Sequence, residues 1–113
     1  MTVQDIQKIL DATVITKKGD LTREVQSACG SDMMSDVLAF VKNQSVLLTG
    51  LVNPQVVRTA EMMDMVCIVF VRGKEPDESI IELAESKDII LLKTKHRMFN
   101  TCGLLYDNGL RGR

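Results

Sequence analysis

The chain has 113 residues, 45% hydrophobic and 26% charged, which is the composition of one folded domain rather than of a disordered segment. A net charge of −1 excludes a strongly basic surface for nucleic acid, and one Tyr, three Phe and no Trp leave few rings on which bases can stack. Three cysteines without a CxxC pair argue against a disulfide framework or a zinc site and fit a reducing cytosol.

Targeting signals are not evident in the sequence. Asp5 interrupts the first residues, so they do not form a signal peptide. The longest apolar run, residues 65–71, is too short to span a bilayer. We therefore expect a cytoplasmic protein without a membrane partner, with residues 1–113 as a single domain.

The first 30 residues predict a helix, a short strand and a second, weaker strand. Apolar residues at helical spacing predict a helix within residues 2–12, capped by Thr2. The β-branched run 13–16 predicts a strand, and residues 17–20 predict a turn. The weak alternation in residues 23–30 is compatible with an edge strand.

A helix is expected over residues 31–43, with Ser31 as its cap. Its apolar stripe comprises Met34, Val37, Leu38 and Val41. Asp32 and Asp36 lie four residues apart and are candidates for a polar edge. We favour the simpler interpretation, that Asp32 stabilises the helix start and Asp36 is solvated.

From Ser45 onward, strands and helices alternate. The expected strands cover residues 45–50, 65–71 and 88–94. The expected helices lie within residues 53–64, 75–87 and 96–109, with Pro54 and Pro76 at the starts of the first two. The last helix carries an apolar stripe of Met98, Phe99, Cys102, Leu105 and Tyr106. This order predicts an α/β fold with three layers, α/β/α, around a small and mainly parallel sheet.

The carboxyl ends of the three regular strands are the expected ligand-binding place, because ligands of such sheets lie there, next to helix N-termini. Gly50 and Gly73 would let a ligand approach the backbone. The candidate ligand-binding residues are Thr49, Gly50, Asn53, Arg72, Gly73, Lys74 and Thr94. The alternative is that these are ordinary turns whose cations are solvated or pair with Glu75, Asp77 or Glu78.

Catalytic and metal-binding patterns are weak. The Walker-type phosphate loop is absent. His96 is the only histidine, and Cys102, six residues later, lies off its helical face. Cys67 falls within an apolar strand, as a packing residue would. We expect no catalytic residue, no metal site and no cofactor.

Seven methionines, several of them on predicted helices, favour an adaptable apolar interface. A small sheet with both edges available often closes its surface by self-association. We therefore expect a homodimer, and a partner protein is an open alternative.

Residues 68–94, IVFVRGKEPDESIIELAESKDIILLKT, resemble the corresponding unit of the DRTGG domain, including that of the N-terminal, non-catalytic domain of HPr kinase/phosphorylase. The segments SDMMSDVLAF, LLTGLVNPQVVRTAE and MFNTCGLLYDNGL extend the resemblance from about Arg23 to Leu110. It implies a regulatory or assembly module, like the DRTGG domains that are fused to CBS-pair domains or to phosphotransacetylase.

The chain departs from the family pattern at its namesake motifs. The Thr-Gly-Gly turn falls on Val71, Arg72 and Gly73, of which only Gly73 is kept, and the Asp-Arg element falls near Val52 and Asn53 and is missing. The catalytic half of HPr kinase is absent, so kinase activity is not implied. The sequence thus predicts a non-catalytic regulatory module for a small anionic metabolite or nucleotide, or else a ligand-free dimeric scaffold that binds a partner protein.

Overall fold

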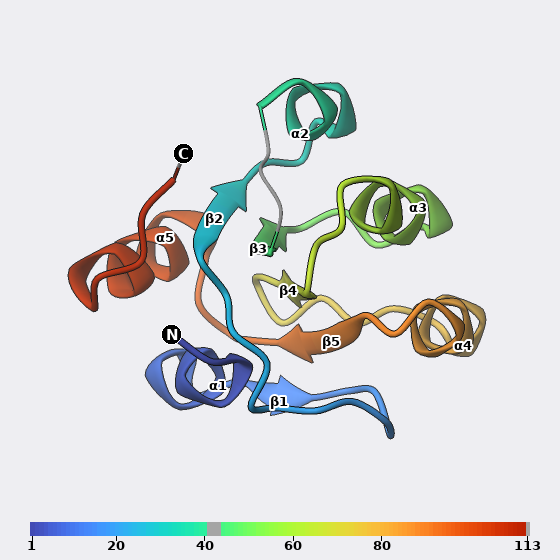
Figure 1. The fold of residues 1–113 in the computed structure, drawn as a ribbon, viewed down its shortest axis with the longest axis horizontal. Coiled ribbons are helices and arrows are strands. Elements are labelled where there is room, and N and C mark those ends of the chain that lie inside the picture. Colours follow the sequence, from blue (N-terminus) through green and yellow to red (C-terminus); the bar gives the residue numbers. More distant parts are fainter. Residues whose placement is uncertain (41–43, 113) are drawn as a thin grey trace.

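A five-stranded sheet in the order β1-β5-β4-β3-β2 forms the middle of the molecule (Figure 1). The computed structural model describes residues 1–40 and 44–112. The strands are β1 (Thr13–Val14), β2 (Ser27–Gly30), β3 (Ser45–Thr49), β4 (Cys67–Phe70) and β5 (Ile90–Lys93). β2, β3, β4 and β5 are parallel, and β1 is antiparallel to β5. The mainly parallel sheet is confirmed.

Helices cover both faces of this sheet. They are α1 (Val3–Leu10), α2 (Met34–Phe40), α3 (Pro54–Met62), α4 (Glu78–Ser86) and α5 (Met98–Asp107). α1 and α5 lie on one face, and α2, α3 and α4 lie on the other (Figure 1). The α/β class and the α/β/α layering are therefore as expected from the sequence. Within residues 1–40 and 44–112, no helix is long and apolar enough to cross a bilayer.

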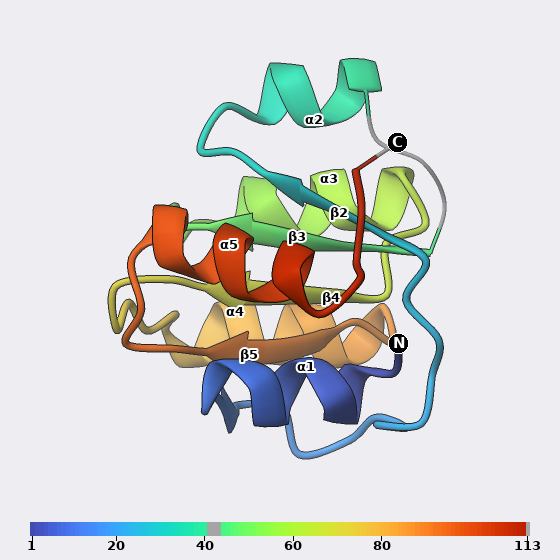
Figure 2. The same ribbon diagram turned by 90° about the vertical axis from the view of Figure 1, so that its left-hand side faces the viewer.

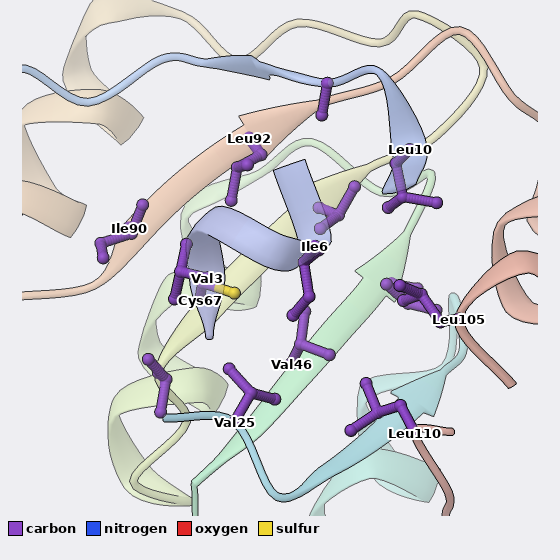
Figure 3. Packing of buried hydrophobic residues seen from close by; sticks show 14 residues of the cluster. Val3, Ile6, Leu10, Val25, Val46, Cys67, Ile90, Leu92, Leu105 and Leu110 are labelled. Atoms are coloured by element: carbon purple, nitrogen blue, oxygen red, sulfur yellow. The ribbon is translucent and has the colours of Figure 1, made fainter. Parts of the chain in front are cut away.

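Each sheet face has its own core. In β4, Cys67 and Val69 point to the α1 and α5 side, whereas Ile68 and Phe70 point to the α2, α3 and α4 side. Figure 3 shows the first of these cores, in which residues of α1, such as Ile6, pack over the central strands. Coverage on both faces explains why the central strands are continuous apolar runs without alternation.

Helix starts follow the capping chemistry of the sequence. Thr2 and Asp5 form a reciprocal capping box at α1. Asn53 caps α3 with Pro54 in its first turn, as expected. At α4 the expectation is corrected: Asp77 is the cap and accepts a hydrogen bond from the Ile80 amide (3.1 Å), so Pro76 precedes the helix instead of opening it.

The expected edge strand in residues 23–30 is present as β2, at one end of the sheet. The helix that follows it begins at Met34, two residues later than a cap at Ser31 would place it. On α2, Val37 is buried and Leu38 is 41% exposed, so the predicted stripe only partly faces the core. Val41, the last member of that stripe, lies outside the described residues.

The apolar stripe expected on α5 is wrong in part. Leu105 is buried, but Phe99 is 86% exposed and Tyr106 is 59% exposed. The helix instead turns Thr101 inward, where its hydroxyl donates to the Arg97 carbonyl (2.8 Å) and so needs no other partner. A threonine whose hydroxyl is hydrogen-bonded within its own helix can occupy a core position. With Thr101 on the buried side of α5, the two aromatic rings lie on the exposed side.

Candidate functional site

The loops that follow β3, β4 and β5 lie together at the carboxyl ends of these parallel strands, on the left in Figure 2. We call this end of the sheet the carboxyl-end rim and define it by residues 49–53, 72–75 and 93–96. Three strands therefore deliver their ends to one place, as the sequence predicts, and all seven candidate ligand-binding residues lie on this rim.

Asp32 ties the segment before α2 to the end of β3. One carboxylate oxygen of Asp32 accepts hydrogen bonds from the Thr49 hydroxyl (3.0 Å) and the Gly50 amide (2.7 Å). The Thr49 hydroxyl also accepts from the Leu51 amide (3.1 Å). Asp32 therefore does more than the expected stabilisation of the helix start, although it is exposed. It places a carboxylate at the rim, a contact between segments 17 residues apart that helical spacing does not reveal.

The Arg72 side chain lies directly over Gly50. A Cβ atom built on Gly50 would be 2.3 Å from one terminal nitrogen of Arg72 and 3.1 Å from its guanidinium carbon. Only glycine therefore allows the guanidinium to lie in this position. Within the described part of the chain, Arg72 forms no ion pair and no side-chain hydrogen bond, so the cation keeps its capacity to bind an anion.

The turn that carries Arg72 is held by its backbone. Arg72 and Gly73 both have positive φ, +61° and +68°, and the Lys74 amide donates to the Val71 carbonyl (3.2 Å), as in a type I′ turn. The Arg72 amide donates to His96 (2.8 Å) and the Gly73 amide donates to Thr94 (2.8 Å), in both cases to the backbone carbonyl. The loops after β4 and β5 are thereby joined.

A pocket of about 530 Å³ opens beside this turn, between the end of β5 and the end of α1. Its lining comprises Leu10, Asp11, Thr13, Gly73, Lys93, Thr94, Lys95 and His96. Lys93 forms an ion pair with Glu75, so the Lys93 charge is already paired within the protein. Lys95 and His96 therefore join Arg72 as rim groups available to a ligand.

Three of the candidate residues have internal hydrogen bonds that hold the rim together. Thr49 bonds to Asp32, and the Asn53 side chain accepts from the Val56 amide at the start of α3 (3.2 Å). Thr94 is buried and its hydroxyl donates to the Leu10 carbonyl at the end of α1 (2.8 Å). Gly50 and Arg72 are brought into contact, and Lys74 is exposed on the turn beside them. Lys95 and His96 lie on the rim and Asp32 contacts it, and none of these three residues is in the predicted set.

The thiols have raised rather than lowered pKa values. Burial raises the pKa of Cys67 to about 12, and burial also raises the pKa values of Cys29 and Cys102. A thiol that stays protonated at neutral pH is a poor nucleophile and a poor metal ligand. Within residues 1–40 and 44–112, no three His, Cys, Asp or Glu side chains are grouped as metal ligands.

Comparison with protein families matches residues 5–107 to the DRTGG domain. The chain belongs to the DRTGG domain family. No curated protein matches the sequence. Among solved structures, the DRTGG chain is similar to the CBS and DRTGG domains of the regulatory region of Clostridium perfringens pyrophosphatase, complexed with the activator diadenosine tetraphosphate.

The likeness to that structure has a TM-score of 0.70 at 16% sequence identity. It covers 92% of this chain and 45% of the pyrophosphatase regulatory region, so the DRTGG chain spans less than half of that protein segment. The shared fold confirms the resemblance to the DRTGG domain that residues 68–94 indicated.

Proposed function

We propose that this DRTGG domain is a non-catalytic regulatory module that binds a small anionic ligand, in the first place a nucleotide, at its carboxyl-end rim. The observation that carries the proposal is the Arg72 guanidinium, placed on Gly50 without an ion-pair partner among the described residues. The turn that carries Arg72 is fixed by two backbone hydrogen bonds of 2.8 Å, so the backbone position of this residue is set before a ligand arrives.

A nucleotide suits the two charges that meet at Gly50. Arg72 offers the fork of donors that binds phosphate, while Asp32 uses one carboxylate oxygen for Thr49 and Gly50. Its other oxygen can accept a hydrogen bond from a ribose hydroxyl or a base amino group. A ligand with both an anionic group and hydrogen-bond donors therefore satisfies the rim better than a simple anion. The nucleotide activator in the pyrophosphatase regulatory region is of the same chemical class.

The wider setting of the module is part of the same proposal. We expect a cytoplasmic homodimer that transmits ligand binding to a partner protein and catalyses no reaction itself. The domain would then act as the N-terminal domain of HPr kinase/phosphorylase is expected to act, as an accessory to another activity.

The alternative is a ligand-free dimeric scaffold that binds a partner protein. Exposed methionines favour it: Met33 is 61% exposed and Met62 is 70% exposed, both on the side of the sheet away from α5. In that case the rim cations would be solvated, and no nucleotide would change the stability of the domain.

Thermal unfolding in the presence of AMP, ADP, ATP and diadenosine tetraphosphate tests the proposal. A ligand at 100 times its dissociation constant adds about 2.7 kcal/mol to the unfolding free energy. We expect at least one of these nucleotides to raise the melting temperature of the wild type and not of Arg72→Ala.

Gly50→Ala is the sharper variant. It keeps every charge but displaces the guanidinium of Arg72, because the new methyl group would occupy its position. We expect this variant to stay folded, since the displaced group is the end of a flexible side chain, and to lose the nucleotide effect. Lys18→Ala is the matched control: it removes one exposed cation near the amino end of β5, close to Gly19, and should bind like the wild type. Equal melting temperatures with and without all four nucleotides would favour the scaffold.

A further inference from the structure

The outer surface of α5 carries two exposed aromatic rings that the rim does not use. Phe99 and Tyr106 are 86% and 59% exposed. With Gly103 between them, they follow the spacing i, i+4, i+7 and share one side of the helix. A side chain at Gly103 would meet no atom within 4 Å. The two rings therefore flank an open gap.

This surface is hollowed. A depression of about 390 Å³ is lined by His96, Phe99, Asn100, Gly103, Leu104, Tyr106 and Asp107. The two rings lie two helical turns apart, about 10.5 Å along the axis. The Arg111 guanidinium lies 3.7 Å from the centre of the Tyr106 ring and donates to the Tyr106 carbonyl, which holds that ring in place. Ordered, exposed aromatic rings around a hollow are typical of a protein interface.

We propose that this side of α5 binds a second copy of the chain, with the two α5 helices antiparallel about a two-fold axis at Gly103. The surface is complementary to itself, because a two-fold rotation about its central gap returns a ring to each end. The gap lets the helix backbones approach closely where a larger side chain would hold them apart.

Polar groups and helix dipoles also favour the antiparallel arrangement. His96 and Asp107 line opposite ends of the hollow, so each Asp107 would lie toward the partner's His96. The positive N-terminal end of each helix dipole would also lie beside the negative end of the other. A parallel pair would place like ends together. The opposed helix dipoles therefore favour one orientation.

This interface is the contact surface of the homodimer proposed above. It depends on the proposed function only for the statement that the chain is a dimer. One helix side with two rings is a small patch, so we expect a dimer that dissociates in the micromolar range. Nucleotide binding at the rim is a separate property, and Arg72→Ala should leave the dimer intact.

Sedimentation velocity over a range of protein concentrations tests the interface. Phe99→Glu and Tyr106→Glu should each raise the dimer dissociation constant at least about tenfold, because each replaces a ring that contacts the second copy with a charge. Both side chains are largely exposed, so the fold should remain. Met62→Glu changes an equally exposed apolar residue on α3, across the sheet from α5, and should leave the dissociation constant unchanged.

Gly103→Leu distinguishes a specific interface, in which the two helices pack closely at Gly103, from non-specific association of exposed apolar surface. Leucine favours helix more than glycine does and fills open space, so the monomer should stay folded. If the interface is specific, the dimer dissociation constant should rise at least about tenfold. Non-specific association would instead become stronger, because the leucine adds apolar surface.

Three results would overturn the interface. The first is an unchanged dimer dissociation constant in Phe99→Glu and Tyr106→Glu. The chain would then still be a homodimer, but its interface would lie on another surface. The second is tighter association of Gly103→Leu. The third is a wild type that stays monomeric at millimolar concentration, which would remove the homodimer as well but not nucleotide binding at the rim.

Discussion

At the scale of single residues, Arg72 combines an unfavourable backbone conformation with a side chain that lies over Gly50. Its φ of +61° is in the left-handed region, which costs about 1 kcal/mol for a residue with a Cβ atom. A glycine would occupy this turn position at lower cost, as Gly73 does beside it. An arginine at such a position, with its guanidinium over Gly50, fits a side chain that serves recognition rather than stability.

Arg72→Gly should therefore be no less stable than the wild type and can be more stable by up to about 1 kcal/mol, because the turn loses its strain. Arg72→Ala keeps the strain and should leave stability unchanged. Urea unfolding of the three proteins measures the difference. A loss of more than about 1 kcal/mol in Arg72→Gly would show that the side chain holds the fold together, contrary to a role in recognition.

At the scale of helices and strands, a single hydroxyl joins the end of β5 to α1. The Thr94 hydroxyl is buried and donates to the Leu10 carbonyl (2.8 Å), one of the carbonyls that a helix leaves unpaired at its C-terminal end. Thr94→Val should destabilise the domain by about 1–3 kcal/mol, since the buried carbonyl would lose its donor. Thr94→Ser keeps the hydroxyl and should lower the free energy of unfolding by less than Thr94→Val does. Chemical denaturation compares the two, and equal losses would mean that packing of the methyl group matters more than the hydrogen bond.

The elements differ in how far the sequence predicted them. β3, β4 and β5 were predictable because both of their faces are covered, which leaves continuous apolar runs between capped helices. The orientation of α5 was not, because five apolar residues at helical spacing suggested one buried side while Thr101 satisfies its own hydroxyl and takes a core position. The rim loops followed from strand order, but the contact between Asp32 and Gly50 joins distant segments and needed the folded chain.

At the scale of the whole molecule, the rim and the outer side of α5 share His96. The His96 carbonyl also accepts the hydrogen bond of the Arg72 amide (2.8 Å), so the turn that carries the cation is bonded to the loop that starts α5. A ligand bound to Arg72 would therefore lie next to the same segment that a second copy bound to α5 would contact. Any coupling between the two sites must be reciprocal.

An amide ¹H–¹⁵N spectrum titrated with diadenosine tetraphosphate, and separately with AMP, reports whether the rim binds a nucleotide. We expect saturable shifts of the Gly50, Arg72 and Gly73 amides with at least one of the two nucleotides, and no such shifts in Gly50→Ala. Rim amides that stay unchanged at millimolar concentrations of both nucleotides, or shifts confined to other parts of the molecule, would contradict nucleotide binding at the rim.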